Sequence, residues 1–152
     1  MNIVLYQPEI PPNTGNIART CACTGASLHL IRPLGFSTDE KSLRRAGLDY
    51  WDMLDVHYYD SFEELEEKYP DHNFYFATKF ATKFHTEIKY KEDDFLVFGK
   101  ETAGLPDVIT EHYSENCIRI PMIGDARSLN LANSVCVVLY ESLRQLEFRD
   151  LT

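Results

Sequence analysis

The sequence lacks the features that mark membrane and secreted proteins. No stretch of its 152 residues approaches the roughly 20 consecutive apolar residues of a membrane span. Residues 2–6 are apolar, but no basic segment precedes them and prolines soon follow, which predicts a first strand rather than a signal peptide. We therefore expect a cytoplasmic protein that does not insert into membranes.

Cysteine is scarce, and its spacing argues against the common cysteine-based sites. The chain has four cysteines, Cys21, Cys23, Cys117 and Cys136. They form no Cys-x-x-Cys unit and no cluster of histidines lies near them, so neither zinc nor another metal is expected. Without a secretory signal, a disulfide framework is not expected either. The cysteines are predicted to be small buried side chains.

Positive charge is also in short supply. The chain has 15 Lys and Arg against 24 Asp and Glu, and its formal net charge is −9. Proteins that bind nucleic acid usually present a basic surface to the phosphates, so this balance alone argues against an RNA partner. The acidic residues, however, are concentrated in residues 63–67 and 92–94, and the local field at a site matters more than the net charge. Six of the arginines lie elsewhere, at Arg19, Arg32, Arg44, Arg45, Arg119 and Arg127.

Three catalytic or nucleotide-binding patterns are missing as well. No Gly-x-Gly-x-x-Gly follows a predicted strand, which argues against a nucleotide-dependent oxidoreductase, and no phosphate-binding P-loop is present. Ser128 could serve as a nucleophile only with a base, and the nearest histidines, His85 and His112, form no recognisable triad pattern. A hydrolase is therefore rejected.

What is present predicts an α/β fold. Hydrophobic residues make up 44% of the chain, including nine Phe and nine Tyr, enough for the core of a single domain spanning residues 1–152. Short apolar runs alternate with helical patterns, which is typical of a mostly parallel sheet flanked by helices. Strands are expected at residues 2–6, 28–31, 56–59, 73–77, 95–98 and 117–120. Helices are expected at residues 17–24, 39–46, 61–69 and 129–146.

One short internal repeat occurs in the chain. The tetrapeptide Ala-Thr-Lys-Phe occupies residues 77–80 and again residues 81–84. Two copies are too few for a repeat architecture, so we interpret the repetition as chance.

Polar and glycine-rich loops are expected to carry the chemistry, because ligands of parallel α/β sheets bind at the carboxyl ends of the strands. In the first such loop, Asn13 and Asn16 can cap the following helix. Arg19 lies one to two turns into that helix, where its guanidinium can hold a phosphate with two hydrogen bonds. An ordinary cap followed by a surface arginine is the alternative for this loop.

The second and third loops follow predicted buried strands. Gly99, directly after an apolar run, allows close approach of the backbone to a ligand. Glu101 can bond polar groups of a ligand or only the backbone of its own turn, and Gly104 indicates a tight turn. In the third loop an apolar run ends at Pro121, and Ser128 is a suitable cap for the long helix that follows.

Taken together, these loops resemble the three motifs of the SPOUT class of RNA ribose methyltransferases. The pattern Asn-x5-Arg fits Asn13 and Arg19. The pattern Gly-x-Glu-x-x-Gly-Leu fits residues 99–105, and the pattern Ile-Pro…Ser-Leu-Asn fits residues 120–130. Order and spacing agree in all three, and the resemblance runs almost from end to end.

Within this class, residues 5–16 and 43–50 are similar to the short branch that methylates the tRNA wobble nucleotide. The resemblance implies 2′-O-methylation of the ribose of nucleotide 34, a cytidine or uridine, with S-adenosylmethionine as methyl donor and leucine tRNAs as expected substrates. Lys100 departs from the pattern, in which proline is frequent. Methylation of another tRNA or rRNA ribose, or a non-catalytic RNA-binding module of the same fold, are the alternatives left open.

The resemblance also implies features of the fold that composition does not reveal. The C-terminal part is expected to be threaded into a deep trefoil knot, an exception to the usual un-knotted topology. The class is dimeric, so a homodimer is expected, with Arg19 reaching the cofactor site of the partner subunit. The residues expected to bind S-adenosylmethionine are Thr78, Gly99, Ile120, Ser128 and Leu129.

The resemblance further suggests roles in catalysis. The ribose 2′-oxygen is expected to attack the methyl carbon in line, with S-adenosylhomocysteine leaving. Arg19, which stays protonated, would stabilise charge developing on that oxygen or act together with a substrate phosphate as base. Glu101, Ser128 and Asn130 would orient ribose and cofactor. The residues expected to contact RNA are Asn13, Asn16, Arg19, Arg44 and Arg45.

Overall fold

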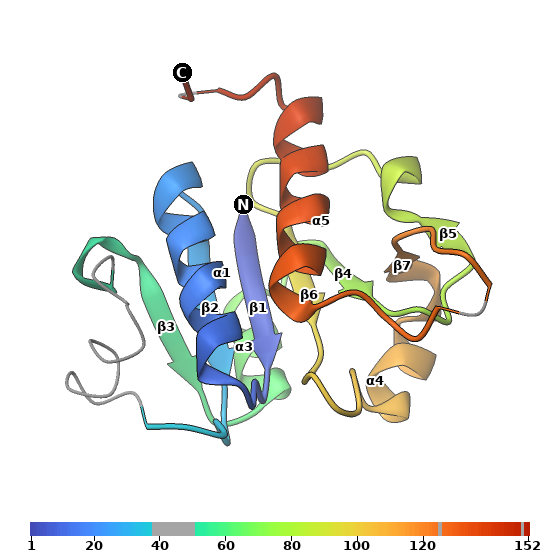
Figure 1. The fold of residues 1–152 in the computed structure, drawn as a ribbon, viewed down its shortest axis with the longest axis horizontal. Coiled ribbons are helices and arrows are strands. Elements are labelled where there is room, and N and C mark those ends of the chain that lie inside the picture. Colours follow the sequence, from blue (N-terminus) through green and yellow to red (C-terminus); the bar gives the residue numbers. More distant parts are fainter. Residues whose placement is uncertain (38–50, 125, 150) are drawn as a thin grey trace.

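A computed structural model describes residues 1–37, 51–124, 126–149 and 151–152. Within these residues the chain forms an α/β fold built on a seven-stranded sheet in the order β3-β2-β1-β6-β4-β7-β5, as Figure 1 shows. Every strand pair is parallel, which confirms the predicted fold class. The strands are β1 (Asn2–Tyr6), β2 (Ser27–Ile31), β3 (Val56–Tyr59), β4 (Phe74–Ala77), β5 (Lys83–Phe84), β6 (Phe95–Phe98) and β7 (Cys117–Arg119). The helices are α1 (Pro11–Thr24), α3 (Phe62–Lys68), α4 (Asp107–His112) and α5 (Leu131–Gln145), with 3₁₀ turns η1 (Trp51–Met53), η2 (His85–Glu87) and η3 (Ser114–Asn116).

Helices cover both faces of the sheet, so the central strands are buried. Side chains alternate along β1: Ile3 and Leu5 join one core cluster and Val4 joins the other. The first cluster is completed by α1 and α5, which pack against each other on one face (Figure 1). The second is closed by Phe62 and Leu65 of α3. Burial on both faces explains why the central strands read as continuous apolar runs.

Helices α1 and α5 begin at residues other than those predicted. The first starts at Pro11 rather than Ile17, and Ile10, its N-cap, makes no capping bond through its side chain. Proline at the first helical position has the backbone angle that a helix needs, which explains the earlier start. Asn13 and Asn16 therefore lie inside the helix, and the capping role predicted for them is wrong. The second, α5, is capped by Asn130, so capping by Ser128 is wrong as well.

Two elements differ from the prediction as a whole. Helix α4 and strand β5 are additional to the predicted elements; β5 comes from the second Ala-Thr-Lys-Phe copy and pairs with β7. The helix predicted at residues 39–46 lies outside the described residues. The remaining strands agree with prediction to within one residue at each end.

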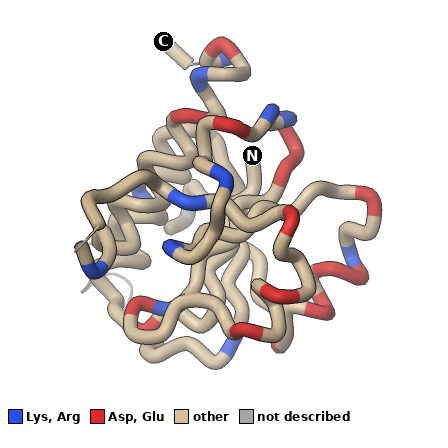
Figure 2. The backbone as a smooth tube through the Cα atoms, turned by 90° about the vertical axis from the view of Figure 1, so that its right-hand side faces the viewer, with Lys and Arg blue, Asp and Glu red and all other residues tan. Residues whose placement is uncertain are grey.

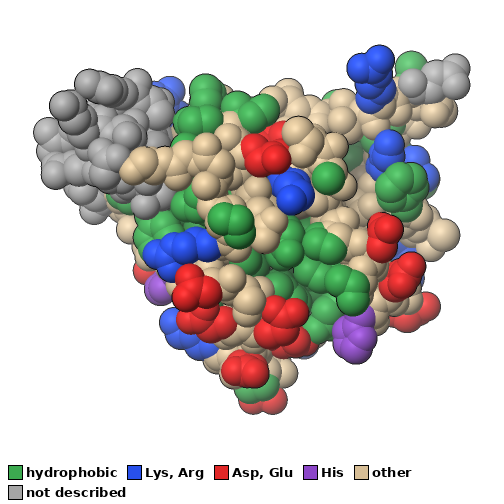
Figure 3. Space-filling model, turned by 90° about the horizontal axis from the view of Figure 1, so that it is seen from below, with side chains coloured by type: hydrophobic (Ala, Val, Ile, Leu, Met, Phe, Trp, Pro, Cys, Tyr) green, Lys and Arg blue, Asp and Glu red, His purple; other side chains and the backbone are tan. Residues whose placement is uncertain are grey.

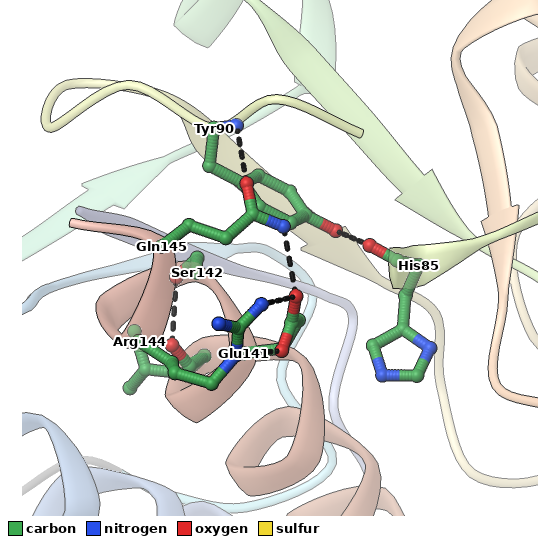
Figure 4. A network of polar contacts seen from close by, with 7 residues as sticks. His85, Tyr90, Glu141, Ser142, Arg144 and Gln145 are labelled. Atoms are coloured by element: carbon green, nitrogen blue, oxygen red, sulfur yellow. Dashed lines mark hydrogen bonds and ion pairs between the residues drawn. The ribbon is translucent and has the colours of Figure 1, made fainter. Parts of the chain in front are cut away.

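The connection before β6 is tied to the end of α5 by polar contacts, drawn in Figure 4. The backbone N–H of Tyr90 donates to Oε1 of Gln145 at 3.2 Å, and the Tyr90 hydroxyl donates to the carbonyl of His85 at 2.6 Å. Gln145 in turn donates to Glu141 at 2.8 Å, and Glu141 also accepts from Arg144. The last turns of α5 are thereby fixed against a segment some 50 residues earlier in the chain.

A buried histidine should make the stability of the fold depend on pH. The His29 side chain on β2 is 1% exposed, with Nδ1 3.0 Å from the Tyr59 hydroxyl and Nε2 3.2 Å from Oδ1 of Asn2. Burial is the largest cause that lowers the pKa of His29 to about 3 from an ordinary value of 6.5. Between these pH values the unfolded chain binds one more proton, so the free energy of unfolding falls as pH is lowered through this window.

We expect His29→Gln to flatten this pH dependence. The slope lost is at most about 1.4 kcal/mol per pH unit, to be measured by urea unfolding between pH 4.5 and 7. His112→Gln, on the exposed side of α4, is the matched control and should keep the wild-type slope. An unchanged slope in the His29 variant would show that other groups cause the dependence.

Candidate active site

A cleft of about 840 Å³ lies where the carboxyl ends of β4, β6 and β7 meet. The loops that follow these three strands form its walls, as expected for a parallel α/β sheet. Figure 3 views the molecule from below, and apolar side chains gather toward the middle of that face with charged side chains around them. The cleft lining includes all five residues predicted to bind S-adenosylmethionine: Thr78, Gly99, Ile120, Ser128 and Leu129.

A relay of hydrogen bonds joins the three motif loops. Nδ2 of Asn130 donates to Oδ1 of Asn13 at 2.9 Å, and Nδ2 of Asn13 donates to Oε1 of Glu101 at 3.2 Å. The carboxylate of Glu101 also accepts from the backbone N–H groups of Glu9 at 2.8 Å and Ile10 at 3.0 Å. Asn130 meanwhile holds the first turn of α5 through its Oδ1. The relay therefore sets the positions of the cleft walls relative to one another.

The relay decides between the roles considered for two of its members. Glu101 bonds the chain's own backbone at the start of α1, where the helix end also favours a negative charge. Asn13 is 7% exposed, lines the cleft and uses both ends of its amide within the relay, so it braces the site; its predicted contact with RNA stays a prediction. Asn130 likewise donates through Nδ2 to the relay and accepts through Oδ1 at the α5 cap.

The folded backbone leaves no room for a side chain at Gly99. A Cβ atom there would lie 2.0 Å from the backbone carbon of Gly104 and 2.2 Å from the nitrogen of Leu105. The turn between them is closed by a hydrogen bond from Gly104 N–H to the Lys100 carbonyl at 2.8 Å, and Gly104 has a φ of 72°. The close approach predicted at Gly99 is thus first an approach to this turn, which forms a wall of the cleft.

The loop after β4 contributes Lys79 and Phe80, which the sequence motifs did not indicate, beside the predicted Thr78. The Thr78 N–H donates to the Ile118 carbonyl at 2.9 Å, and the Phe80 N–H donates to Oγ1 of Thr78 at 3.3 Å. This turn places Thr78, Lys79 and Phe80 on the cleft lining. Arg119, at the end of β7, also lines the cleft. The first Ala-Thr-Lys-Phe copy was the signal that could have pointed to the loop.

The charge of the cleft differs from that of the whole protein. On the side drawn in Figure 2, acidic residues follow one edge while several basic residues lie toward the middle. Among the described residues, Nε of Arg119 is buried and has no hydrogen-bond partner, so a polar ligand could satisfy it. The charged side chains that line the cleft are Lys79, Lys100, Arg119 and Arg127 against Glu101 and Asp107. The net charge of −9 is therefore no argument against an anionic substrate here.

Arg19 and Asn16 are not part of this cleft. Both side chains are exposed on α1, and neither contributes to the lining formed by the described residues. The two other predicted RNA contacts, Arg44 and Arg45, lie outside the described residues. A single chain thus brings together the predicted cofactor residues and Asn130, but not the arginine expected to act in catalysis.

Removing the charge of Glu101 should loosen the site. In Glu101→Gln the amide presents N–H groups to backbone donors, so at least one charge-assisted hydrogen bond is lost, at a cost of about 2 kcal/mol. We expect a lower melting temperature together with weaker binding of S-adenosylmethionine, measured by calorimetry. Glu111→Gln on exposed α4 is the control. Wild-type stability and affinity in the Glu101 variant would contradict the bracing role.

Two other kinds of site are absent from the part of the chain that the structure describes. It contains no group of three or more His, Cys, Asp or Glu side chains arranged to hold a metal ion. Its described helices also include none long and apolar enough to cross a membrane.

The fold matches that of RNA methyltransferases of solved structure. One, described as giving structural insights into the 2-OH methylation of C/U34 on tRNA, is 45% identical, with a TM-score of 0.90 over 97% of each chain. Another, an AdoMet-bound rRNA methyltransferase from Sinorhizobium meliloti, is 26% identical, with a TM-score of 0.79 over 95% of this chain and 56% of that one. The class defined by fold and site is that of the α/β RNA methyltransferases.

The chain belongs to the SpoU rRNA Methylase family, whose model matches residues 1–140. It is similar to the tRNA (cytidine(34)-2′-O)-methyltransferase of Escherichia coli (strain K12), with 52% identity over 152 residues, which are 97% of this chain and 95% of that protein. The resemblance to ribose methyltransferases inferred from the sequence is thereby confirmed.

Proposed function

We propose that this chain methylates the ribose 2′-hydroxyl of nucleotide 34, the wobble nucleotide, in cytoplasmic tRNA. The observation that carries the proposal is the convergence of the predicted cofactor residues on one cleft, in a chain 52% identical to a named tRNA (cytidine(34)-2′-O)-methyltransferase over nearly its whole length. No feature of the described residues favours a non-catalytic binding module, or methylation of a different ribose, over methylation of ribose 34.

The cleft fits S-adenosylmethionine as the methyl donor. Its volume lies in the range of about 300–1,000 Å³ usual for small-molecule sites. Its walls combine apolar side chains, Leu129 and Ile120 among them, with backbone groups of three loops, and the buried Nε of Arg119 lacks a partner among the described residues. When bound, the donor supplies an electrophilic methyl group on a sulfonium. Thr78, Gly99, Ile120, Ser128 and Leu129 are the residues proposed to hold it.

The protein then has to position and activate the ribose hydroxyl. The cleft walls are fixed by the relay through Asn130, Asn13 and Glu101, so the donor site is formed before RNA arrives. Arg19 remains protonated and stabilises negative charge that develops on the 2′-oxygen, or orients a substrate phosphate that accepts the proton. Ser128 lines the cleft and is proposed to orient ribose or cofactor.

A second copy of the chain is proposed to complete the active site. Arg19 is exposed on α1 and does not line the cleft of its own chain, and it is proposed to serve the cleft of a partner. The partner also enlarges the RNA surface of a protein proposed to be one domain of 152 residues. Asn16, Arg44 and Arg45 are the further RNA contacts proposed. If phosphate contacts hold the RNA, the methylation rate falls as salt rises.

The knotted topology expected of the class is proposed for the C-terminal part. Strand β7 lies between β4 and β5, yet α5, which follows it, packs against α1 and β6, so the chain crosses back over the sheet. The connection before β6 is bonded to the last turn of α5 through Tyr90 and Gln145 (Figure 4). Both features support threading of α5 past that connection.

The test is methyl transfer from labelled S-adenosylmethionine to total tRNA from a strain that lacks this gene. Nuclease mapping then identifies the labelled nucleotide, and separation of the isoacceptors tests the expectation of leucine tRNAs. Label at ribose 34 supports the proposal. Label at another ribose would change the substrate, and binding of the donor without transfer would support the binding module instead.

A further inference from the structure

Phe80 is an aromatic side chain exposed at the edge of the cleft. It lines the cleft, yet its surface is 81% exposed. Nζ of Lys79, the neighbouring residue, lies 5.0 Å from the centroid of the Phe80 ring, so the ring carries a cation beside one face. Because the exposed ring also lines the cleft, it is placed to contact a ligand that enters the cleft.

The backbone that carries Phe80 is held in place. Its N–H donates to Oγ1 of Thr78, and the Ala81 N–H donates to the Thr78 carbonyl at 3.4 Å. Thr78 is itself bonded to the Ile118 carbonyl of β7, and the Ala81 side chain is buried. The exposed ring therefore projects from an anchored turn, so little ordering of the backbone is needed when a partner binds.

The second Ala-Thr-Lys-Phe copy provides an internal comparison. Nζ of Lys83 is bonded to the carbonyl of Glu115 at 2.7 Å, and Phe84 belongs to strand β5, paired with β7. Of residues 81–84, all of which the structure describes, none lines the cleft. The same four residues thus occur twice, and only the first copy presents its lysine and phenylalanine to the site.

We propose that Phe80, with Lys79 beside it, is the stacking platform for the base of the nucleotide whose ribose is methylated. This inference rests on the proposed function, since it assumes an RNA substrate. Bases in single-stranded loops can be splayed out and stacked on aromatic side chains, and every base offers a π face. A platform of this kind accepts cytosine and uracil alike and fixes the ribose through its base. The ammonium group of Lys79 is placed to pair with the phosphate next to that base.

The proposal separates Phe80, a positioning residue, from the groups that bind the methyl donor. With an anticodon stem-loop RNA as substrate, Phe80→Ala should raise KM about tenfold or more, the range that loss of one stacked base implies, with kcat changed much less. The affinity for S-adenosylmethionine and the oligomeric state should not change. Phe80→Tyr should restore wild-type KM, whereas Phe80→Leu should not. Phe84→Ala, the matched control in the second copy, should behave as wild type.

The decisive comparison uses a second stem-loop that keeps the ribose of nucleotide 34 but has no base there. Wild-type protein should methylate it with a raised KM, and Phe80→Ala should cause no further loss. An equal loss on both RNAs, weaker binding of S-adenosylmethionine, or dissociation of subunits would each overturn the platform. Absence of methyl transfer at nucleotide 34 by the wild type would instead contradict the proposed function. Transfer by the wild type with an unchanged KM in Phe80→Ala contradicts the platform alone.

Discussion

Arg19→Ala lowers methyl transfer to tRNA by at least about a hundredfold while the affinity for S-adenosylmethionine stays at the wild-type value. The size of the effect is that of removing one donor that stabilises developing oxyanion charge. The affinity is kept because the residues proposed to hold the donor all line the cleft of one chain, and Arg19 is not among them. Single-turnover rates and calorimetric titration measure the two quantities separately. Arg149→Ala, at a surface arginine that pairs with Glu92, is the control and keeps full activity.

Mixing subunits tests whether Arg19 acts on the partner's cleft. Leu129→Glu places a charge in the apolar wall of the cleft and should prevent the donor from binding. In a mixture with Arg19→Ala, each hybrid dimer has one intact cleft served by the intact arginine of the other subunit. Activity should return to about one quarter of the wild-type rate. No recovery from the two inactive variants would place Arg19 on the cleft of its own subunit.

Gly99→Ala destabilises the protein by about 3 kcal/mol and abolishes binding of the methyl donor. The added Cβ would lie 2.0 Å from the backbone carbon of Gly104, so the turn that forms one wall of the cleft has to move. Thermal unfolding and donor titration would both report the change.

Two other glycines, Gly124 and Gly104, serve as comparisons for that result. Gly124→Ala meets no atom within 4 Å and should leave stability unchanged. Gly104→Ala also has space but requires an alanine at a φ of 72°, which costs about 1–2 kcal/mol. We expect the destabilisation to increase from Gly124 to Gly104 to Gly99. A Gly99 variant as stable as the Gly124 variant would mean that the turn relaxes freely and that the wall is not rigid.

The sequence was sufficient to predict the sheet except for its short edge strand β5, and also the place of the site. Residues 95–98 were predicted as a buried strand with the bounds that the structure has, since a run apolar on both faces occurs where helices cover both faces. The loops after β1, β6 and β7 could be assigned to one edge because the carboxyl ends of parallel strands meet there. This reasoning needs only local patterns and one topological rule.

The internal design of the site could not be predicted, because it depends on contacts between distant residues. Asn13 and Asn130 are 117 positions apart, and nothing local to either indicates a hydrogen bond between their amides. The role of Gly99 likewise depends on how the turn at Gly104 folds back. Phe80 has no local signal other than the repeat, whose two copies differ only in where the sheet places them.

The central claim is that the oxygen methylated is the ribose 2′-hydroxyl of nucleotide 34. Its most direct test is mass spectrometry of two anticodon stem-loop RNAs incubated with the protein and S-adenosylmethionine, identical except that one carries 2′-deoxyribose at nucleotide 34. The account predicts a single added methyl group, located at nucleotide 34, on the ribose form and none on the deoxy form. Methylation of the deoxy form, or of both RNAs at a different nucleotide, would contradict it.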